Sequence, residues 1–150
     1  MNSNIKYHLT ELQNILPQAW EIIESYKVIA LLGDLGAGKT TFVSALCHYL
    51  NPDIEASSPT FSLINEYHFT DKEGQKKTIF HSDWYRIRDE EEAIQAGIED
   101  MLWTPQSISF IEWPEKAPLL LQSMEVLYIH IEIVDAENRI LHFTNSLSFN

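Results

Sequence analysis

The stretch of residues 28–41 limits what this chain can fold into more than any other part of the sequence. It begins with five apolar residues, VIALL, which is typical of a buried strand. Residues 33–40, GDLGAGKT, then match G-x-x-x-x-G-K-[ST], the phosphate-binding P-loop. Apolar residues at helical spacing follow from Phe42 to Leu50, so strand, loop and helix come in the order that the motif requires. A glycine-rich turn before an ordinary helix is the alternative interpretation.

The chemistry of a polyphosphate-binding site explains why the motif has these residue types at these positions. The loop glycines allow positive φ angles and let backbone N–H groups approach phosphate oxygens without an intervening Cβ. The helix that begins near Lys39 adds its free N-terminal amides and the positive end of its dipole. We expect Lys39 to reach the β- and γ-phosphates and the Thr40 hydroxyl to bind Mg²⁺. The nucleotide-binding residues are therefore predicted to be Gly33, Asp34, Leu35, Gly36, Ala37, Gly38, Lys39, Thr40 and Thr41.

Composition narrows the class of protein. Hydrophobic residues make up 45% of the 150 residues, which excludes a mainly disordered chain and fits one domain over residues 1–150. The net charge of −12 argues against a broad nucleic-acid footprint, so another protein is expected to hold any nucleic acid. We expect a cytoplasmic protein, because neither a signal-peptide core nor an apolar run of membrane-spanning length is found. The one cysteine, Cys47, is interpreted as a packed residue.

The hydrophobic pattern predicts an α/β fold, a P-loop NTPase-like three-layer sandwich with a mixed central sheet and a C-terminal β-hairpin. Strands are expected over residues 5–9, 28–32, 62–69, 77–82, 107–112, 126–134 and 139–144. Besides the helix after the P-loop, helices are expected over residues 17–26, from the charge cluster 86–92 up to an interruption at Gly97, and over residues 98–103. Pro17 is placed in a first helical turn because proline is poorly tolerated in a helix interior.

Two strand ends offer the carboxylate that a P-loop needs beside it. Glu112 follows the apolar residues 108–111, and Asp83 follows residues 79–82. Mg²⁺ binds through one or two carboxylates plus phosphate and water, so Glu112, Asp83 and Thr40 are the candidate metal ligands. The alternatives are an ion pair with a lysine for Glu112 and a turn or helix cap for Asp83. Arg86 is expected to clamp the Asp83 region rather than to contact phosphate.

The turn SSPTF at residues 57–61 resembles a nucleotide-sensing switch. Thr60 is expected to approach the γ-phosphate, so that order in the loop reports the nucleotide state. A simple turn is the alternative.

Five motifs in a fixed order give a resemblance to the TsaE (YjeE) family. They are GDLGAGKTT at residues 33–41, SPTF at 58–61, NEY at 65–67, HSDWYR at 81–86 and IEWP at 111–114. The resemblance runs over about residues 17–143. Ser82 and Trp84 depart from the family pattern, which usually has Phe and Leu at these positions.

The resemblance implies an ATPase that is needed to form threonylcarbamoyladenosine (t6A) in bacterial tRNA. It implies ATP and Mg²⁺ as cofactors and TsaD and TsaB as partners, with tRNA contacted only through them. Residue by residue, it implies Thr40 and Glu112 as Mg²⁺ ligands, and family adenine contacts fall near Thr10 and Arg139. The catalytic residues are then predicted to be Lys39, Thr60, Asp83 and Glu112.

Three other functions are weighed against this one. A small-molecule kinase usually carries several arginines over the phosphates and a lid, whereas this chain has only Arg86, Arg88 and Arg139 and no long lid insertion. A GTP switch is disfavoured because no Asn-Lys-x-Asp segment is found. A binding module with a degenerate loop is disfavoured because Lys39 and Thr40 are intact.

Overall fold

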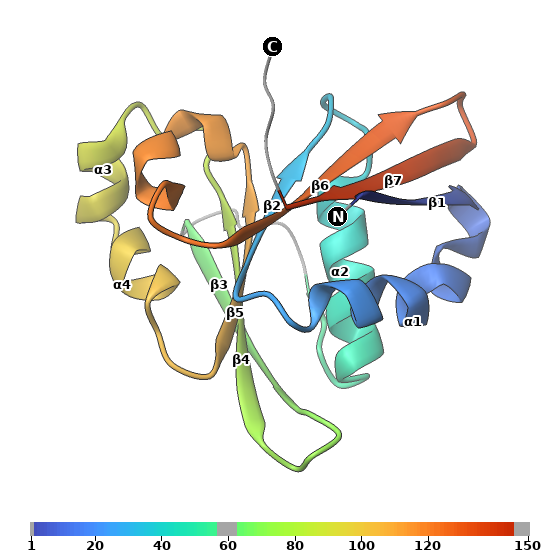
Figure 1. Cartoon of the computed structure of the whole chain (residues 1–150), viewed down its shortest axis with the longest axis horizontal. Coiled ribbons are helices and arrows are strands. Elements are labelled where there is room, and N and C mark those ends of the chain that lie inside the picture. Colours follow the sequence, from blue (N-terminus) through green and yellow to red (C-terminus); the bar gives the residue numbers. More distant parts are fainter. Residues whose placement is uncertain (1, 57–62, 146–150) are drawn as a thin grey trace.

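The computed structural model describes residues 2–56 and 63–145, and its strands join in one seven-stranded sheet (Figure 1). The strands are β1 Asn2–His8, β2 Val28–Leu32, β3 Ile64–Thr70, β4 Lys76–Asp83, β5 Ser107–Glu112, β6 Val126–Ile133 and β7 Asn138–Thr144. Their order in the sheet is β1-β7-β6-β2-β5-β4-β3. The four central strands β6, β2, β5 and β4 run parallel, while β1, β7 and β3 pair antiparallel toward the two edges.

Helices cover both faces of this sheet, which confirms the predicted three-layer α/β architecture (Figure 1). The helices are α1 Leu12–Ile23, α2 Lys39–Leu50, α3 Glu90–Gln95, α4 Ile98–Leu102 and the 3₁₀ helices η1 Leu9–Glu11, η2 Pro114–Lys116 and η3 Pro118–Leu121. Strand β2 serves both core layers, because alternate side chains of a strand point to opposite faces. Ile29 and Leu31 pack with α1 and α2, whereas Val28 and Ala30 pack with α3 and α4.

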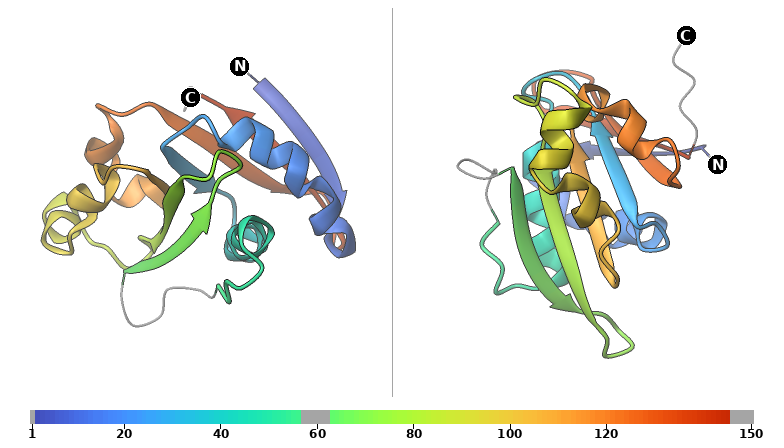
Figure 2. Two further views of the ribbon diagram at one scale, coloured as in Figure 1. Left: turned by 90° about the horizontal axis from the view of Figure 1, so that it is seen from below. Right: turned by 90° about the vertical axis from the view of Figure 1, so that its left-hand side faces the viewer.

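The parallel strands end together, and this fixes where the P-loop meets the carboxylates. Leu31 of β2 pairs with Glu112 of β5, and Glu112 pairs in turn with Asp83 of β4. The loop between β2 and α2 therefore lies at the same sheet edge as both carboxylates. The β3–β4 hairpin turn extends at the opposite end of the sheet (Figure 2).

Two helix starts differ from the sequence prediction. Helix α1 begins five residues earlier than expected, at Leu12, and Pro17 lies inside it on the exposed side. The proline removes one helix hydrogen bond, but burial of a helical stripe outweighs that loss; the buried residues are Leu12, Leu16, Ala19 and Ile23. Helix α3 begins only at Glu90, because Asp89 caps it by accepting a hydrogen bond from the Glu92 backbone N–H at 2.9 Å.

Two smaller expectations concern Cys47 and the membrane. Cys47 is fully buried on α2, as predicted, and burial raises the pKa of its thiol to about 12. Within residues 2–56 and 63–145, no helix combines the length and the apolar character that crossing a bilayer demands.

Candidate active site

The P-loop occupies residues 33–38 between β2 and α2, and its three glycines all have positive φ. The angles are +150° at Gly33, +85° at Gly36 and +107° at Gly38, which caps the N-terminus of α2. A Cβ on Gly33 would lie 2.9 Å from the carbonyl oxygen of Ile131, so the close approach of the loop to β6 also requires glycine. The predicted need for positive φ at these positions is confirmed.

Lys39 begins α2 and is only 5% exposed. Its Nζ donates a hydrogen bond to the carbonyl oxygen of Gly33 at 2.8 Å and lies 3.8 Å from the ring centroid of Trp113. Burial lowers the pKa of the Lys39 ammonium, while nearby carboxylates act against this shift; in order of effect they are Glu112, Glu115, Asp83 and Asp34. The amine thus sits at the loop, held by a carbonyl and an aromatic face.

Thr40 and Glu112 meet although 72 residues separate them. The Thr40 hydroxyl donates to the Glu112 carboxylate, at 2.8 Å from Oε2 and 3.0 Å from Oε1. Glu112 ends β5 and is 3% exposed, so its charge is largely withdrawn from water. Hydroxyl and carboxylate oxygens are ligands that suit Mg²⁺, and the predicted pairing of the P-loop with a strand-end carboxylate is present in the fold.

Asp83 lies on the neighbouring strand, across the register from Glu112. Its Oδ1 accepts a hydrogen bond from the Tyr85 backbone N–H at 3.0 Å. Burial raises the pKa of the Asp83 carboxyl, the Tyr85 N–H lowers it, and the Glu112 charge raises it further. The expected clamp by Arg86 is not found: this residue is exposed and makes no hydrogen bond or ion pair with the described part of the chain.

Sequence reasoning missed two residues that contact this cluster. His81, fully buried on β4, has its Nε2 2.6 Å from Oε2 of Glu112. Its signal was its spacing, because residues two apart on a strand share a face and His81 precedes Asp83 by two. Trp113 covers Lys39 with a φ of +60°, a conformation that costs about 1–3 kcal/mol outside glycine. Its place directly after Glu112 was the available clue.

Arg139 and Thr10 occupy different positions relative to the loop. Arg139 is 7% exposed; its Nε donates to the carbonyl oxygen of Ala37 at 3.0 Å, and its Nη1 donates to those of Asp135 and Asn138. Thr10 lies on η1, its hydroxyl 2.8 Å from Nδ1 of His8. The Leu9 N–H donates to the carbonyl oxygen of Glu137 at 2.8 Å, which joins this arm to the β6–β7 turn. Arg139 therefore contacts the P-loop directly, whereas the arm that carries Thr10 is joined to the β6–β7 turn, and the contact of either residue with adenine stays a prediction.

Thr60 and the rest of the predicted switch turn lie outside the described residues.

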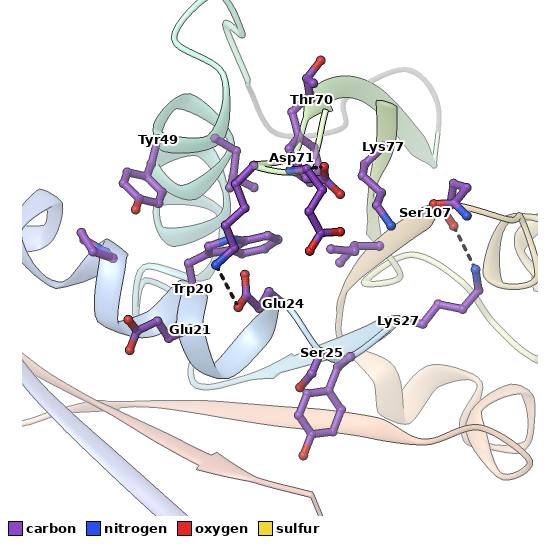
Figure 3. A pocket seen from close by; sticks show the side chains of 18 residues that line it. Trp20, Glu21, Glu24, Ser25, Lys27, Tyr49, Thr70, Asp71, Lys77 and Ser107 are labelled. Carbon is purple, nitrogen blue, oxygen red and sulfur yellow. Dashed lines mark hydrogen bonds and ion pairs between the residues drawn. The ribbon is translucent and has the colours of Figure 1, made fainter. Parts of the chain in front are cut away.

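A groove of about 900 Å³ lies at the other end of the strands (Figure 3). Its side chains come from the end of α1, the β3–β4 hairpin and the start of β5, and they include Trp20, Glu24, Asp71 and Lys77. Lys27 donates from its amine to the carbonyl oxygen of Thr104. None of the predicted site residues lines this groove.

The comparisons with known proteins agree with this geometry. The family model described as threonylcarbamoyl adenosine biosynthesis protein TsaE matches residues 7–141. The tRNA threonylcarbamoyladenosine biosynthesis proteins TsaE of Haemophilus influenzae and Rickettsia bellii are 37% and 32% identical, over 72% and 79% of this chain. The alignments cover 64% and 77% of those relatives, so the chain spans less than two thirds of the Haemophilus protein.

A solved structure shows the same fold. The crystal structure of YdiB from Bacillus subtilis superposes with a TM-score of 0.61 at 25% sequence identity. The superposition covers 97% of this chain and 87% of the YdiB chain. The family model matches most of the chain, and Glu112 from the IEWP motif binds Thr40 of the P-loop. This chain therefore belongs to the TsaE family, whose members take part in tRNA threonylcarbamoyladenosine biosynthesis.

Proposed function

We propose that this chain binds and hydrolyses Mg·ATP and thereby supports t6A formation by a TsaD–TsaB complex. The observation that carries the proposal is the convergence of Lys39, Thr40 and Glu112 on the glycine-rich loop, with hydrogen bonds of 2.8 Å from both Lys39 and Thr40. Such a set of a cation, a hydroxyl and a carboxylate beside free helix amides is what a Mg·nucleotide site needs.

Binding would use the backbone first. The amides of the P-loop and the first turn of α2 that are not bonded within the loop would donate to the phosphates, and the dipole of this helix favours their negative charge. Lys39 has three N–H donors, of which the Gly33 carbonyl takes one, so two remain for phosphate oxygens. Arg139 would hold the Ala37 carbonyl, and with it the loop, while Arg139 and Thr10 border the adenine.

Thr40 and Glu112 would hold Mg²⁺, with Asp83 beside them, because their oxygens form the hard donor set that this ion prefers. The bound ion would neutralise charge on the phosphates. Asp83 would orient a water in line with the γ-phosphate. The water oxygen then bonds to phosphorus as the bond to the β–γ bridging oxygen breaks, which yields ADP, phosphate and a proton.

The arginines of the chain support completion of the site by a partner. Arg139 is bound by carbonyl groups, Arg88 pairs with Glu92 at 2.7 Å, and Arg86 is exposed. We therefore propose that the TsaD–TsaB complex raises a slow basal hydrolysis and that the Thr60 turn senses the γ-phosphate. The partners would also hold the tRNA, since the net charge here is −12. We also propose that the protein acts in the cytoplasm and that residues 1–150 form a single domain.

The test compares two lysines at opposite ends of the sheet. Lys39→Ala is expected to weaken ATP binding and hydrolysis by about 100-fold or more, because a buried donor to the phosphates is lost. The control, Lys77→Ala, lies in the distant groove and should leave both unchanged. Titration of a fluorescent ATP analogue and phosphate release, each with and without TsaD–TsaB, give the measurements. Wild-type turnover by Lys39→Ala would contradict the site, and equal rates with and without partners would contradict completion by them.

A further inference from the structure

His81 is a fully buried polar residue in contact with Glu112, and the proposed chemistry gives it no task. It lies on β4, between β5 and the edge strand β3, with no exposed surface. Burying an imidazole costs free energy unless its nitrogens are hydrogen-bonded, so packing alone is a poor explanation for a histidine here.

Only one of its ring nitrogens is used. The Nε2 atom lies 2.6 Å from Oε2 of Glu112, whereas Nδ1 has no hydrogen-bond partner among the described residues. A proton on Nδ1 would be buried without an acceptor, whereas a proton on Nε2 meets a carboxylate. The partners therefore place a proton on Nε2, which donates to Glu112.

This bond holds a carboxylate that Thr40 also binds. Oε2 of Glu112 accepts from Nε2 of His81 at 2.6 Å and from the Thr40 hydroxyl at 2.8 Å. Two donors on different elements, β4 and α2, leave the carboxylate little freedom to rotate. Residues that hydrogen-bond to a metal-ligating carboxylate without touching the metal commonly orient it and tune metal affinity. The bond from His81 to Glu112 is therefore of the kind that affects a metal site.

We propose that His81 is a positioning residue, which holds the Glu112 carboxylate in the orientation that the metal–nucleotide site requires. The inference rests on the proposed function, because it presupposes that Glu112 serves that site. His81 itself touches neither nucleotide nor metal and acts only through Glu112.

Two substitutions of similar polarity separate positioning from packing. In His81→Gln the amide nitrogen can reach the place of Nε2, whereas in His81→Asn the shorter side chain ends near the place of Nδ1. Ser109→Ala is the matched control, because Ser109 is also fully buried and its hydroxyl oxygen has no partner in the part of the chain that the structure describes. It lies on β5 at a position that faces the other side of the sheet from Glu112.

The first readout is the ratio of ATP affinities measured with Mg²⁺ and with EDTA. His81→Asn should lower this ratio about 10- to 100-fold while the affinity in EDTA stays within about twofold of wild type. His81→Gln should restore most of the ratio, and Ser109→Ala should not change it. A wild-type ratio in His81→Asn, or equal loss in the Gln and Asn variants, would overturn the proposal. If the wild-type protein itself binds no Mg·ATP, the proposed function fails first.

A second readout needs no variant to bind nucleotide. Long-range nitrogen–proton NMR of the nucleotide-free wild-type protein should show His81 with its proton on Nε2, its signal assigned by comparison with His81→Gln. Glu112→Gln should shift that proton because its acceptor loses its charge. A proton on Nδ1, or no change in Glu112→Gln, would contradict the bond on which the proposal stands.

Discussion

The two ends of the parallel strands hold their polar side chains in different ways. At the carboxyl ends, Lys39, His81 and Glu112 are 5%, 0% and 3% exposed, and each bonds a group from another element or from the loop. At the amino ends, the charged residues that line the groove of Figure 3 are exposed or half-buried. Its ion pair joins Lys72 and Glu24 at 3.8 Å, with side chains 80% and 35% exposed.

The difference teaches which feature marks a chemical site. The groove offers about 900 Å³, yet its ion pair between Lys72 and Glu24 is exposed. The P-loop end is instead marked by buried polar groups, by positive φ at three glycines and by Trp113 at +60°. Buried polar groups and strained backbone both cost free energy, so their coincidence is stronger support for function than an open volume.

The largest difference between the two ends of the sheet is expected when one glycine at each end is replaced by alanine. Gly33→Ala should destabilise the protein by about 1–3 kcal/mol and weaken ATP binding, because the new Cβ would lie 2.9 Å from a backbone oxygen at a φ of +150°. Gly74→Ala, in the β3–β4 turn, has a φ of +81° with nothing within 4 Å of the new Cβ. It should cost about 1–2 kcal/mol, less than Gly33→Ala because no atom crowds the new Cβ, and leave ATP binding intact.

Urea unfolding and titration of a fluorescent ATP analogue measure both glycine variants. If Gly33→Ala were no less stable than Gly74→Ala, the tight approach of the P-loop to β6 would not be what its glycine serves.

The sequence predicted the fold best where pattern and local chemistry agree. Strand β2, the P-loop and helix α2 match their prediction because an apolar run, a glycine-rich loop and apolar residues at helical spacing follow one another within a few residues. Helix α1 was misjudged because Pro17 is a strong local signal, whereas the helical stripe that opposes it depends on a face that only the tertiary fold buries.

The site shows the same limit. Glu112 and Asp83 could be predicted, since parallel strands end at one sheet edge and a P-loop needs a carboxylate there. The bond from His81 to Glu112 could not, because it depends on the register between β4 and β5, which no local pattern sets. Arg139 was placed near adenine, but its bonds to the Ala37 carbonyl and to the hairpin depend on how β7 lies beside the loop.

Asp83→Asn tests whether a buried carboxylate at the carboxyl ends of the strands lowers the stability of the fold while it serves ATP hydrolysis. Burial raises the pKa of Asp83, so folding favours its protonated form. Its contribution to stability is present below the unfolded pKa of about 3.9 and is lost as the pH rises through the folded pKa. At pH 7 in EDTA, Asp83→Asn should therefore unfold at higher urea than wild type, by less than the loss in Gly33→Ala, while hydrolysing ATP at least tenfold more slowly.

The sign is checked by urea unfolding from pH 4 to 7. The advantage of the variant should grow with pH, and the Tyr85 N–H should keep its acceptor because the Asn side chain retains Oδ1. Asp53→Asn, at an exposed position, controls for the loss of one carboxylate. A variant that is less stable than wild type at pH 7 would show that the Asp83 charge stabilises the apo fold.

Lys72→Ala should have the smallest effect, and for that reason it defines the other end of the comparison. The Lys72–Glu24 pair is long at 3.8 Å, and an exposed pair gives little because water screens it and two flexible side chains must be ordered. We expect a change of at most about 0.5 kcal/mol in the free energy of unfolding, smaller still at 1 M salt, with ATP affinity unchanged. A loss above about 1 kcal/mol, or weaker ATP binding, would mean that the groove is energetically coupled to the P-loop across the sheet, and the contrast between the two ends would then fail.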